Sequence, residues 1–277
     1  MKIIALVDGS PYAHSVCALA GWAGMRMGAS VEALHVLGRR EAGAQDLSGS
    51  IRLGARSALL EELAALDATR AKLVMQRGRA ILEDAKLVLA AAGVSEVTTR
   101  LRQGDLLEEI GTGADMIVVG KRGEAADFAK GHLGSNLERI VRGAKTPVLV
   151  AARAFAPVEK VLVAYDGGAS ALRAVEHVAN SALYAGLDIV VVSVGEGAAI
   201  AGGLADAQSR LRAAGHNAQV RQVSGQPDKV LAQMVAEGGF GMLVMGAYGH
   251  SRIRNLIIGS TTTEMIRSCK VPVMLLR

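Results

Sequence analysis

The stretch MLVMGAYGHSRIRNLIIGSTT, residues 242–262, decides the fold class of this chain. Its first four residues form an apolar run, which is typical of a short strand buried in a parallel sheet. Glycines follow at 246, 249 and 259, and the residues from Ser260 onward predict the first turns of a helix. Glycine lets the backbone approach a ligand closely, and a helix N-terminus offers N–H groups to an anion. The stretch therefore predicts a strand, a phosphate-binding loop and a helix in an α/β domain.

The same pattern occurs about half a chain earlier, in MIVVGKRGEAADFAKGHLGSN, residues 116–136. The likeness extends to both flanks. IALVDG at 4–9 matches LVAYDG at 162–167, and a proline opens the last segment of each half, at positions 147 and 272. A repeat of this length indicates two copies of one domain. We expect these domains at residues 1–153 and 158–277, joined by a short linker that contains Pro157.

Strands and helices are expected to alternate in each copy. Strands are expected at 2–8, 30–37, 97–102, 116–120 and 147–152, and again at 160–166, 188–194, 218–223, 242–246 and 272–276. Helices are expected at 11–28, 55–92, 105–111 and 134–143, and again at 169–186, 200–214, 228–238 and 260–268. This alternation favours two doubly wound α/β domains, each with a five-stranded parallel sheet and helices on both faces.

The first copy carries an insertion. Asp8 and Asp166 are 158 residues apart, whereas Gly104 and Gly225 are 121 apart, so the first copy has 37 additional residues, mostly within 39–92. Four leucines share one helical face of this region: Leu59, Leu63, Leu66 and Leu73. Ile81, Ala85, Val88 and Ala92 continue a similar spacing. The pattern fits one long helix or a helical hairpin, which could cover the sheet, form a lid or make a subunit contact.

Composition narrows the class of protein. The chain is 51% hydrophobic and 3% aromatic, so its core must be aliphatic. A net charge of +5 with so few aromatic residues argues against a nucleic-acid surface. No apolar stretch approaches the ~18 residues of a membrane span, and we expect a cytoplasmic protein without a membrane partner. Cys17 and Cys269 have no metal-ligand spacing, and we expect both thiols to be buried and inert.

The positions of the Asp-Gly turns and the glycine loops at strand ends predict a candidate site. In an open α/β sheet, ligands bind beyond the carboxyl ends of strands, where the strand order reverses. Asp8 and Asp166 end the first strand of each copy, and the glycine loops follow each fourth strand. The carboxylate could accept hydrogen bonds from ribose hydroxyls or an exocyclic amine while the loop holds phosphates. Arg252 and Arg254 could add positive charge in the second loop, as could Lys121 and Arg122 in the first.

Taken together, the Gly-x2-Gly-x9-Gly-Ser spacing of the second loop, the strand ending in Asp166 and the Val-Pro-Val segment at 271–273 resemble the nucleotide-binding pattern of the universal stress protein family. The resemblance covers both halves of the chain, as in a tandem universal stress protein. It implies a sheet order of 3-2-1-4-5 and binding of an adenine nucleotide, usually ATP, with or without Mg²⁺. It also implies that the last strands pair in antiparallel fashion at a dimer interface.

The resemblance assigns roles residue by residue. In the second copy, Asp166 would contact the adenosine, the backbone of Val194 would read the adenine edge, and the ribose and phosphates would be held by Gly246, Gly249, Gly259, Ser260 and Thr261. The matching residues of the first copy are Asp8, Val36, Gly120, Gly123, Gly134, Ser135 and Asn136. The first loop is one residue longer and contains Glu124 and Asp127, which would repel phosphate. We therefore expect tighter binding in the second copy.

Catalysis has little support in the sequence. The GxxxxGK[ST] motif of a P-loop NTPase does not occur, and the six histidines are scattered. His250 and His132 lie near glycine loops, without an evident orienting partner. A nucleotide-dependent regulatory module for stress response is the first interpretation. A nucleotide-hydrolysing or adenylylating enzyme and a nucleotide-free interaction scaffold stay open as alternatives.

Two expectations concern assembly. Proline lacks the N–H that a central strand would use, so the strands at 147–152 and 272–276 are predicted sheet edges. We expect these edges to pair with each other, giving a pseudo-two-fold arrangement within one chain. We also expect a homodimer of tandem chains that uses the leucine face of the 39–92 region.

Overall fold

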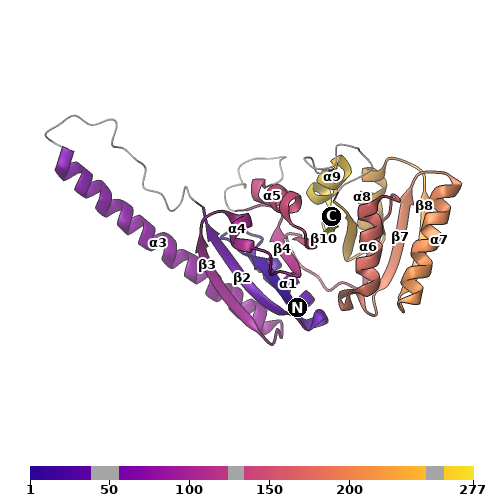
Figure 1. Ribbon diagram of the computed structural model, residues 1–277, viewed down its shortest axis with the longest axis horizontal. Coiled ribbons are helices and arrows are strands. Elements are labelled where there is room, and N and C mark those ends of the chain that lie inside the picture. The colour runs from indigo at the N-terminus through magenta and orange to yellow at the C-terminus, as the bar shows by residue number, and fades with distance from the viewer. Residues whose placement is uncertain (39–55, 124–133, 248–258) are drawn as a thin grey trace.

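The computed structural model of the chain describes residues 1–38, 56–123, 134–247 and 259–277. Ten strands of these segments form one continuous sheet, in the order β3-β2-β1-β4-β5-β10-β9-β6-β7-β8 (Figure 1). In the first half of the chain they are β1 (Lys2–Leu6), β2 (Ser30–Leu37), β3 (Val97–Gln103), β4 (Met116–Gly120) and β5 (Val148–Ala151). In the second half they are β6 (Lys160–Ala164), β7 (Asp188–Val194), β8 (Asn217–Val223), β9 (Met242–Gly246) and β10 (Val273–Leu276).

Each half of the sheet has the order 3-2-1-4-5, as the resemblance implied. Within each half, every pair of neighbouring strands is parallel. The halves meet where β5 and β10 pair in antiparallel fashion, with Leu149 opposite Met274 and Val150 opposite Val273. The expected α/β fold and the expected edge-to-edge pairing are therefore both confirmed. The pairing covers two strand edges that would otherwise be exposed.

Helices cover both faces of the sheet. They are α1 (Ala13–Met27), α3 (Arg56–Ala91), α4 (Leu106–Ile110), α5 (Ser135–Gly143), α6 (Ala169–Asn180), α7 (Ala198–Ala213), α8 (Pro227–Glu237) and α9 (Ser260–Ser268). One apolar cluster joins α1, α6, α7 and part of α3 to one sheet face. The other cluster joins α4, α5, α8 and α9 to the opposite face. The buried residues are almost all aliphatic, as the composition predicted.

One helix expectation needs correction, and one open alternative is decided. The helix expected at 169–186 ends at Asn180, and a separate 3-10 turn, η2 (Ala182–Tyr184), follows it. The reason is local, because the Ser181 hydroxyl accepts a hydrogen bond from the Leu183 N–H at 3.3 Å and so starts a new turn. The 55–92 region forms one helix, α3, rather than a hairpin.

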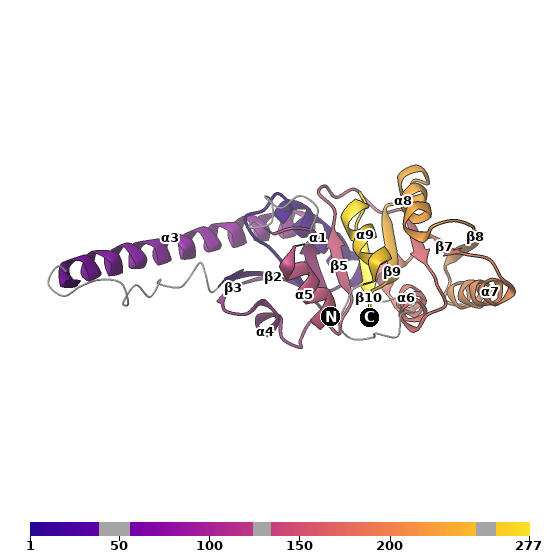
Figure 2. The ribbon, with the colours of Figure 1, turned by 90° about the horizontal axis from the view of Figure 1, so that it is seen from above.

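Helix α3 covers the sheet with only its C-terminal part. Leu82, Ala85 and Leu89 are buried against the sheet, whereas Leu66 and Leu73 are 61% and 60% exposed. Figures 1 and 2 show the N-terminal part of α3 projecting away from the body of the molecule. The expectation that this helix covers the sheet therefore holds for residues from Gly78 onward, where a Cβ would meet the Leu101 side chain at 2.8 Å.

The two halves also contact each other outside the sheet. Arg26 of α1 donates to the Leu183 carbonyl at 2.7 Å, and Arg277 donates to the Arg142 carbonyl at 2.8 Å. Both cysteines are buried, as expected, and burial raises the pKa of the Cys17 thiol to about 12. None of the helices within the described ranges has the length and apolar content needed to cross a membrane.

Candidate functional site

Each half of the sheet carries one pocket beyond the carboxyl ends of its first and fourth strands. The pocket of the second half, which we call the second pocket, has a volume of about 370 Å³. The pocket of the first half, the first pocket, is larger, at about 610 Å³. The strand order reverses between β1 and β4 and between β6 and β9, so both pockets lie at a switch point of the sheet.

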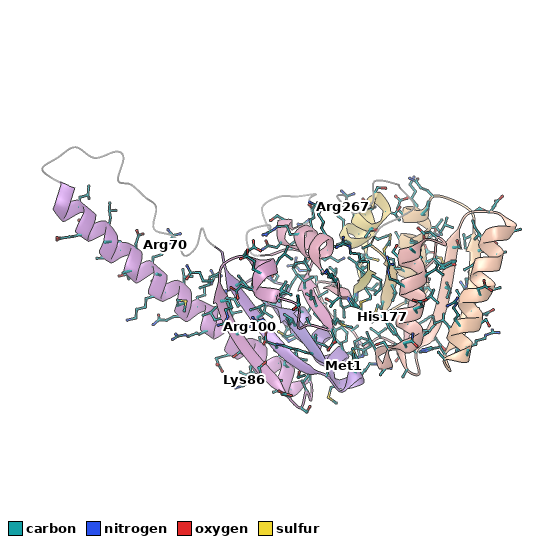
Figure 3. The ribbon with its side chains drawn as sticks, in the orientation of Figure 1. Met1, Arg70, Lys86, Arg100, His177 and Arg267 are labelled. Carbon is teal, nitrogen blue, oxygen red and sulfur yellow. The ribbon has the colours of Figure 1, made fainter. Side chains whose placement is uncertain are left out.

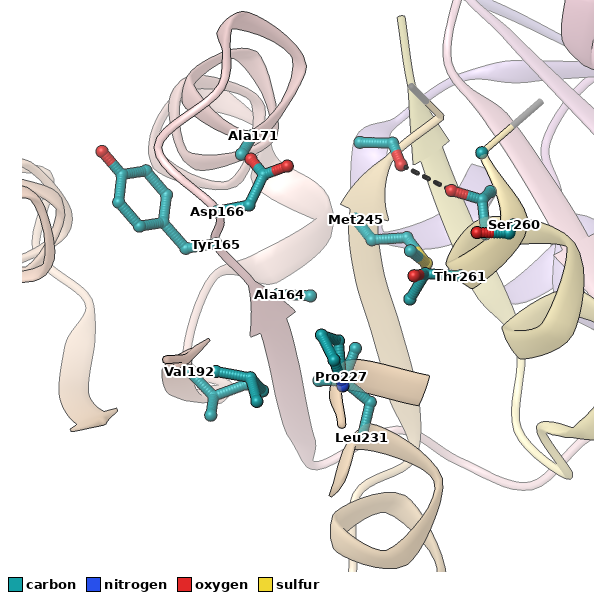
Figure 4. Close-up of a pocket in the computed structure, with 14 residues that line it drawn as sticks. Ala164, Tyr165, Asp166, Ala171, Val192, Pro227, Leu231, Met245, Ser260 and Thr261 are labelled. Carbon is teal, nitrogen blue, oxygen red and sulfur yellow. Dashed lines mark hydrogen bonds between the residues drawn. The ribbon is translucent and has the colours of Figure 1, made fainter. Parts of the chain in front are cut away.

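The acidic residue of the second pocket stands at the turn from β6 into α6. Gly167 has φ +79°, a left-handed conformation that glycine adopts readily. This turn lets the Asp166 carboxylate accept a hydrogen bond from the Gly168 N–H at 2.8 Å. Asp166 is exposed and points toward the opening, across from Ser260 and Thr261 (Figure 4).

The glycine that ends β9 is required by packing. A Cβ at Gly246 would lie 2.3 Å from the Ser170 hydroxyl oxygen, so a larger residue would push α6 away from the strand. The Thr262 hydroxyl donates to the Gly246 carbonyl at 3.3 Å and fixes the start of α9 beside the strand end. Gly246 is therefore where strand, helix α6 and helix α9 meet, which explains glycine at the head of the loop.

The N-terminus of α9 faces the same pocket. Gly259 is its N-cap residue, and no side chain in the described segments caps this helix end. The first turn of a helix has N–H groups without partners in the helix itself, and it carries partial positive charge. Gly259, Ser260, Thr261 and Thr262 all line the pocket. The arrangement offers backbone donors and hydroxyls to an anionic group.

The rest of the second pocket is apolar. Its wall is formed by Ala164, Ala171, Val192, Val194, Pro227, Leu231 and Met245. In Figure 4, Pro227 and Leu231 of α8 lie on one side of the opening, and Val192 lies on the neighbouring strand. An apolar wall next to a carboxylate and a helix N-terminus suits a ligand with a flat apolar part and an anionic part.

The structure brings most of the predicted residues of the second copy together. Six of them line the second pocket: Asp166, Val194, Gly246, Gly259, Ser260 and Thr261. Gly249 and Arg252, together with Arg254 and His250, lie outside the described residues. Sequence reasoning missed Tyr165, Pro227 and Leu231. Pro227 had a usable signal, since proline favours the first position of a helix and this helix begins at the pocket.

The position of Tyr165 in the second pocket depends on packing, and no sequence motif marks it. It precedes Asp166 and is 7% exposed. A Cβ at Gly203 of α7 would lie 3.0 Å from the Tyr165 hydroxyl, so the glycine makes room for the ring. Burial raises the pKa of Tyr165, and the nearby Asp206 and Asp166 carboxylates raise it further. The phenol therefore stays neutral beside the carboxylate of the site.

The first pocket is lined by all seven residues predicted for it: Asp8, Val36, Gly120, Gly123, Gly134, Ser135 and Asn136. Asp8 accepts from the Ser10 N–H at 3.0 Å, in the same way that Asp166 accepts from Gly168. A Cβ at Gly123 would lie 3.0 Å from an Asp8 carboxylate oxygen, so the glycine loop passes next to the acid. Glu124 and Asp127, and also His132, lie outside the described residues.

The first pocket differs from the second in its polar lining. Tyr12 lies against Gly120, where the second domain has Ser170 against Gly246. His35 lines the pocket and forms a 2.7 Å hydrogen bond between its Nδ1 and the Val7 carbonyl. Asp105 caps α4, and the Arg139 guanidinium hydrogen-bonded to it lowers the pKa of this carboxyl. Arg122 also lines the pocket, as expected for a loop cation.

The position of Lys121 differs from the expectation that this residue adds positive charge to the first loop. This side chain does not line the first pocket, because its ammonium donates to the Cys269 carbonyl at the C-terminal end of α9. It is 8% exposed, and burial lowers the pKa of its amine. A cation at a helix C-terminus is favoured by the helix dipole. Lys121 therefore links the first glycine loop to the helix that begins at the second pocket.

Comparisons with known proteins identify the class. The sequence profile of the universal stress protein family matches residues 1–152 and 157–277. A universal stress protein of Synechocystis sp. is 38% identical over 286 aligned positions, covering 100% of this chain and 99% of the relative. The chain therefore belongs to the universal stress protein family and carries two copies of its domain.

Solved structures agree on the fold. A universal stress protein from Archaeoglobus fulgidus covers 100% of this chain and 98% of its own, with 22% identity and a TM-score of 0.70. A putative universal stress protein from Pseudomonas aeruginosa covers 99% of this chain and 92% of its own, with 17% identity and a TM-score of 0.60. Both therefore share the fold of this chain over nearly its whole length.

Proposed function

We propose that the chain binds an adenine nucleotide, ATP, mainly in the second pocket, and acts as a nucleotide-dependent regulatory module in stress response. The observation that carries this proposal is the convergence in one pocket of a carboxylate, an apolar wall and a helix N-terminus. The carboxylate suits ribose hydroxyls, the apolar wall suits a base, and the helix N-terminus suits phosphates. The family pattern of the glycine loop supports the same assignment.

The apolar wall would receive the adenine ring. The pairing of β6 with β7 ends at Ala164 opposite Val192, so Val194 extends β7 two residues beyond its neighbour on that side. Its backbone can then hydrogen-bond to the edge of a base, as the family resemblance implied. Leu231 and Pro227 close the other side of the pocket. Apolar walls with a few placed polar groups are the usual makeup of a small-molecule site.

The triphosphate would lie at the start of α9. Gly259, Ser260 and Thr261 supply N–H groups and hydroxyls there. Arg252 of the loop would add a cation, in keeping with its place in the sequence. Mg²⁺ usually binds through phosphates and waters rather than through a protein cage, so it would accompany ATP.

Isothermal titration calorimetry with ATP and Mg²⁺ tests the proposal. We expect Asp166→Ala to weaken binding about tenfold or more, which corresponds to ~1.4 kcal/mol. Asp8→Ala is the matched control, since each aspartate accepts one backbone N–H two residues further along. Absence of binding to the unaltered chain would refute the proposal, and equal losses in the two variants would refute the assignment to the second pocket. Phosphate release measured in the same samples separates a binding protein from a hydrolase.

A further inference from the structure

The projecting part of α3, residues 59–77, is unlike any other helix of the described chain in how little it packs. Leu59 is 41% exposed, and Leu66 and Leu73 have still larger exposed fractions. A helix of 36 residues is ~54 Å long, and among the residues of α3 whose burial is described, the first buried one is Gly78. The equivalent helix of the second domain, α7, has 16 residues and packs on the sheet. We call residues 59–77 the α3 arm.

The arm carries an apolar seam. Leu59, Leu63, Leu66 and Leu73 follow one another at intervals of four, three and seven residues, which is the spacing of a coiled-coil contact line. Most of the stability of a helix in a protein comes from the packing of its apolar face, and this part of α3 leaves that face in water. Burial of the three leucines that are described as exposed would supply the missing stabilisation.

The charges of the arm indicate what covers the seam. Its outer part holds Asp67, which is partly exposed, and the exposed Glu61 and Glu62. Arg70 and Lys72 follow toward the body, and Arg79 comes just after the arm. Arg70 lies on this projecting part (Figure 3). A second copy of the arm placed antiparallel would set each acidic part beside a basic part. A parallel placement would set like charges side by side along the whole arm, whereas the antiparallel pair does so only where the two Arg70 side chains meet near its centre.

We propose that two copies of this chain pair through their α3 arms, antiparallel and with two-fold symmetry. The axis passes near Arg70, and Leu66 of each copy approaches Leu73 of the other. Such a contact is isologous, so it closes at two chains and forms no filament. The β5–β10 pairing already joins the two domains inside each chain, so the arm pairing brings four domains into one particle.

Sedimentation velocity of the full chain over a range of concentrations tests the pairing. We expect a dimer that dissociates on dilution, and we expect Leu66→Glu with Leu73→Glu to raise the dissociation constant at least tenfold. Leu87→Glu is the control, since this leucine is 68% exposed on the same helix but lies outside the arm, next to the body of the molecule. A monomer at every concentration overturns the proposal, as does a dimer that persists in the seam variant.

Charge reversal tests the identity of the partner. One variant replaces Glu61, Glu62 and Asp67 with lysine, and the other replaces Arg70, Lys72 and Arg79 with glutamate. Each variant alone should dimerise at least tenfold more weakly than the unaltered chain, and an equimolar mixture should restore dimers that contain one copy of each. If the seam is instead covered by another segment of the same chain or by a different protein, mixing restores nothing.

Cross-linking tests the direction. Arg70→Cys lies near the proposed axis, so oxidation should link two chains through this position. Leu59→Cys lies near the outer end, where an antiparallel pair keeps the two cysteines far apart. The native Cys17 and Cys269 are buried and give a low background. Linkage through Leu59→Cys would show a parallel pair and overturn the proposed arrangement.

Discussion

The two domains have the same sheet and differ in what each places around it. In the first domain, the helix that follows the second strand has 36 residues, whereas its counterpart in the second domain has 16. The strands keep the order 3-2-1-4-5 in both. A crossover helix can lengthen without disturbing the strand pairs on which the pocket depends. The comparison indicates that the sheet is the shared frame and that this crossover helix is where the two copies differ in length.

The glycine loops show a second difference. Lys121 of the first loop occupies the place that Ala247 has in the second, and it reaches across to the Cys269 carbonyl. Ala247 instead donates its N–H to the Leu276 carbonyl at 2.7 Å. The first loop thus uses its lysine to contact the other domain, whereas the matching Ala247 bonds within its own domain.

The expected difference in ATP affinity between the two loops can be tested with a matched pair of substitutions. Gly259→Val adds a side chain where α9 begins, so we expect it to remove most ATP binding, with at least a tenfold loss of affinity. Gly134→Val makes the same change in the first loop, where a Cβ would have ordinary contacts of 3.4 Å or more. We expect little loss there. Calorimetry on both variants decides the matter, and a larger loss from Gly134→Val would show that the working pocket is in the first domain.

The comparison of the two crossover helices predicts a stability difference within α3. Leu89 is fully buried, so Leu89→Ala should lower the free energy of unfolding by ~2–5 kcal/mol, as should Leu211→Ala in α7. Leu87→Ala, at a residue 68% exposed, should change it by less than ~0.5 kcal/mol. Urea unfolding followed by circular dichroism measures all three. Equal effects of Leu87→Ala and Leu89→Ala would contradict the packing described for this helix.

The first helices of the two domains differ at the position of His177. His177 of α6 matches Leu19 of α1, and burial lowers the pKa of His177 to about 4. Its ring lies edge-on to Tyr184, and neither the His177 Nε2 nor the Tyr184 hydroxyl has a hydrogen-bond partner among the described residues. A histidine buried in its neutral form costs stability in acid, because the unfolded chain, with a pKa near 6.5, binds the proton more readily.

The third prediction is that His177 makes the free energy of unfolding depend on pH. Stability is retained above pH 6.5 and falls as the pH drops from there toward 4, by about 2 kcal/mol between pH 7 and pH 5. His177→Leu copies the residue of the first domain and should remove that share of the pH dependence. Urea unfolding at the two pH values measures it. An unchanged difference between pH 7 and pH 5 in the variant would show that His177 is not buried in its neutral form.

Sequence reasoning failed where two arrangements share one pattern. The leucine spacing of α3 fits a single helix and a hairpin equally, since both have the same period. Tyr165 and Leu231 gave no sign of their place, because both enter the pocket through the packing of neighbouring elements. The direction of the Lys121 side chain depends on Cys269, 148 residues away in the chain. The residues next to Lys121 in the sequence do not indicate the direction of its side chain.

By itself, the sequence determined the fold class, the repeat and the aspartate, glycine and hydroxyl residues that line the two pockets. These follow from local rules: apolar runs form buried strands, glycine permits close approach, proline marks strand edges, and the carboxyl ends of parallel strands meet at one side of the sheet. The tertiary structure alone decided that α3 is one projecting helix, that Lys121 joins the domains, and that α8 closes the second pocket. Each of these depends on which distant surfaces come into contact, and burial free energy settles that only when the whole chain packs.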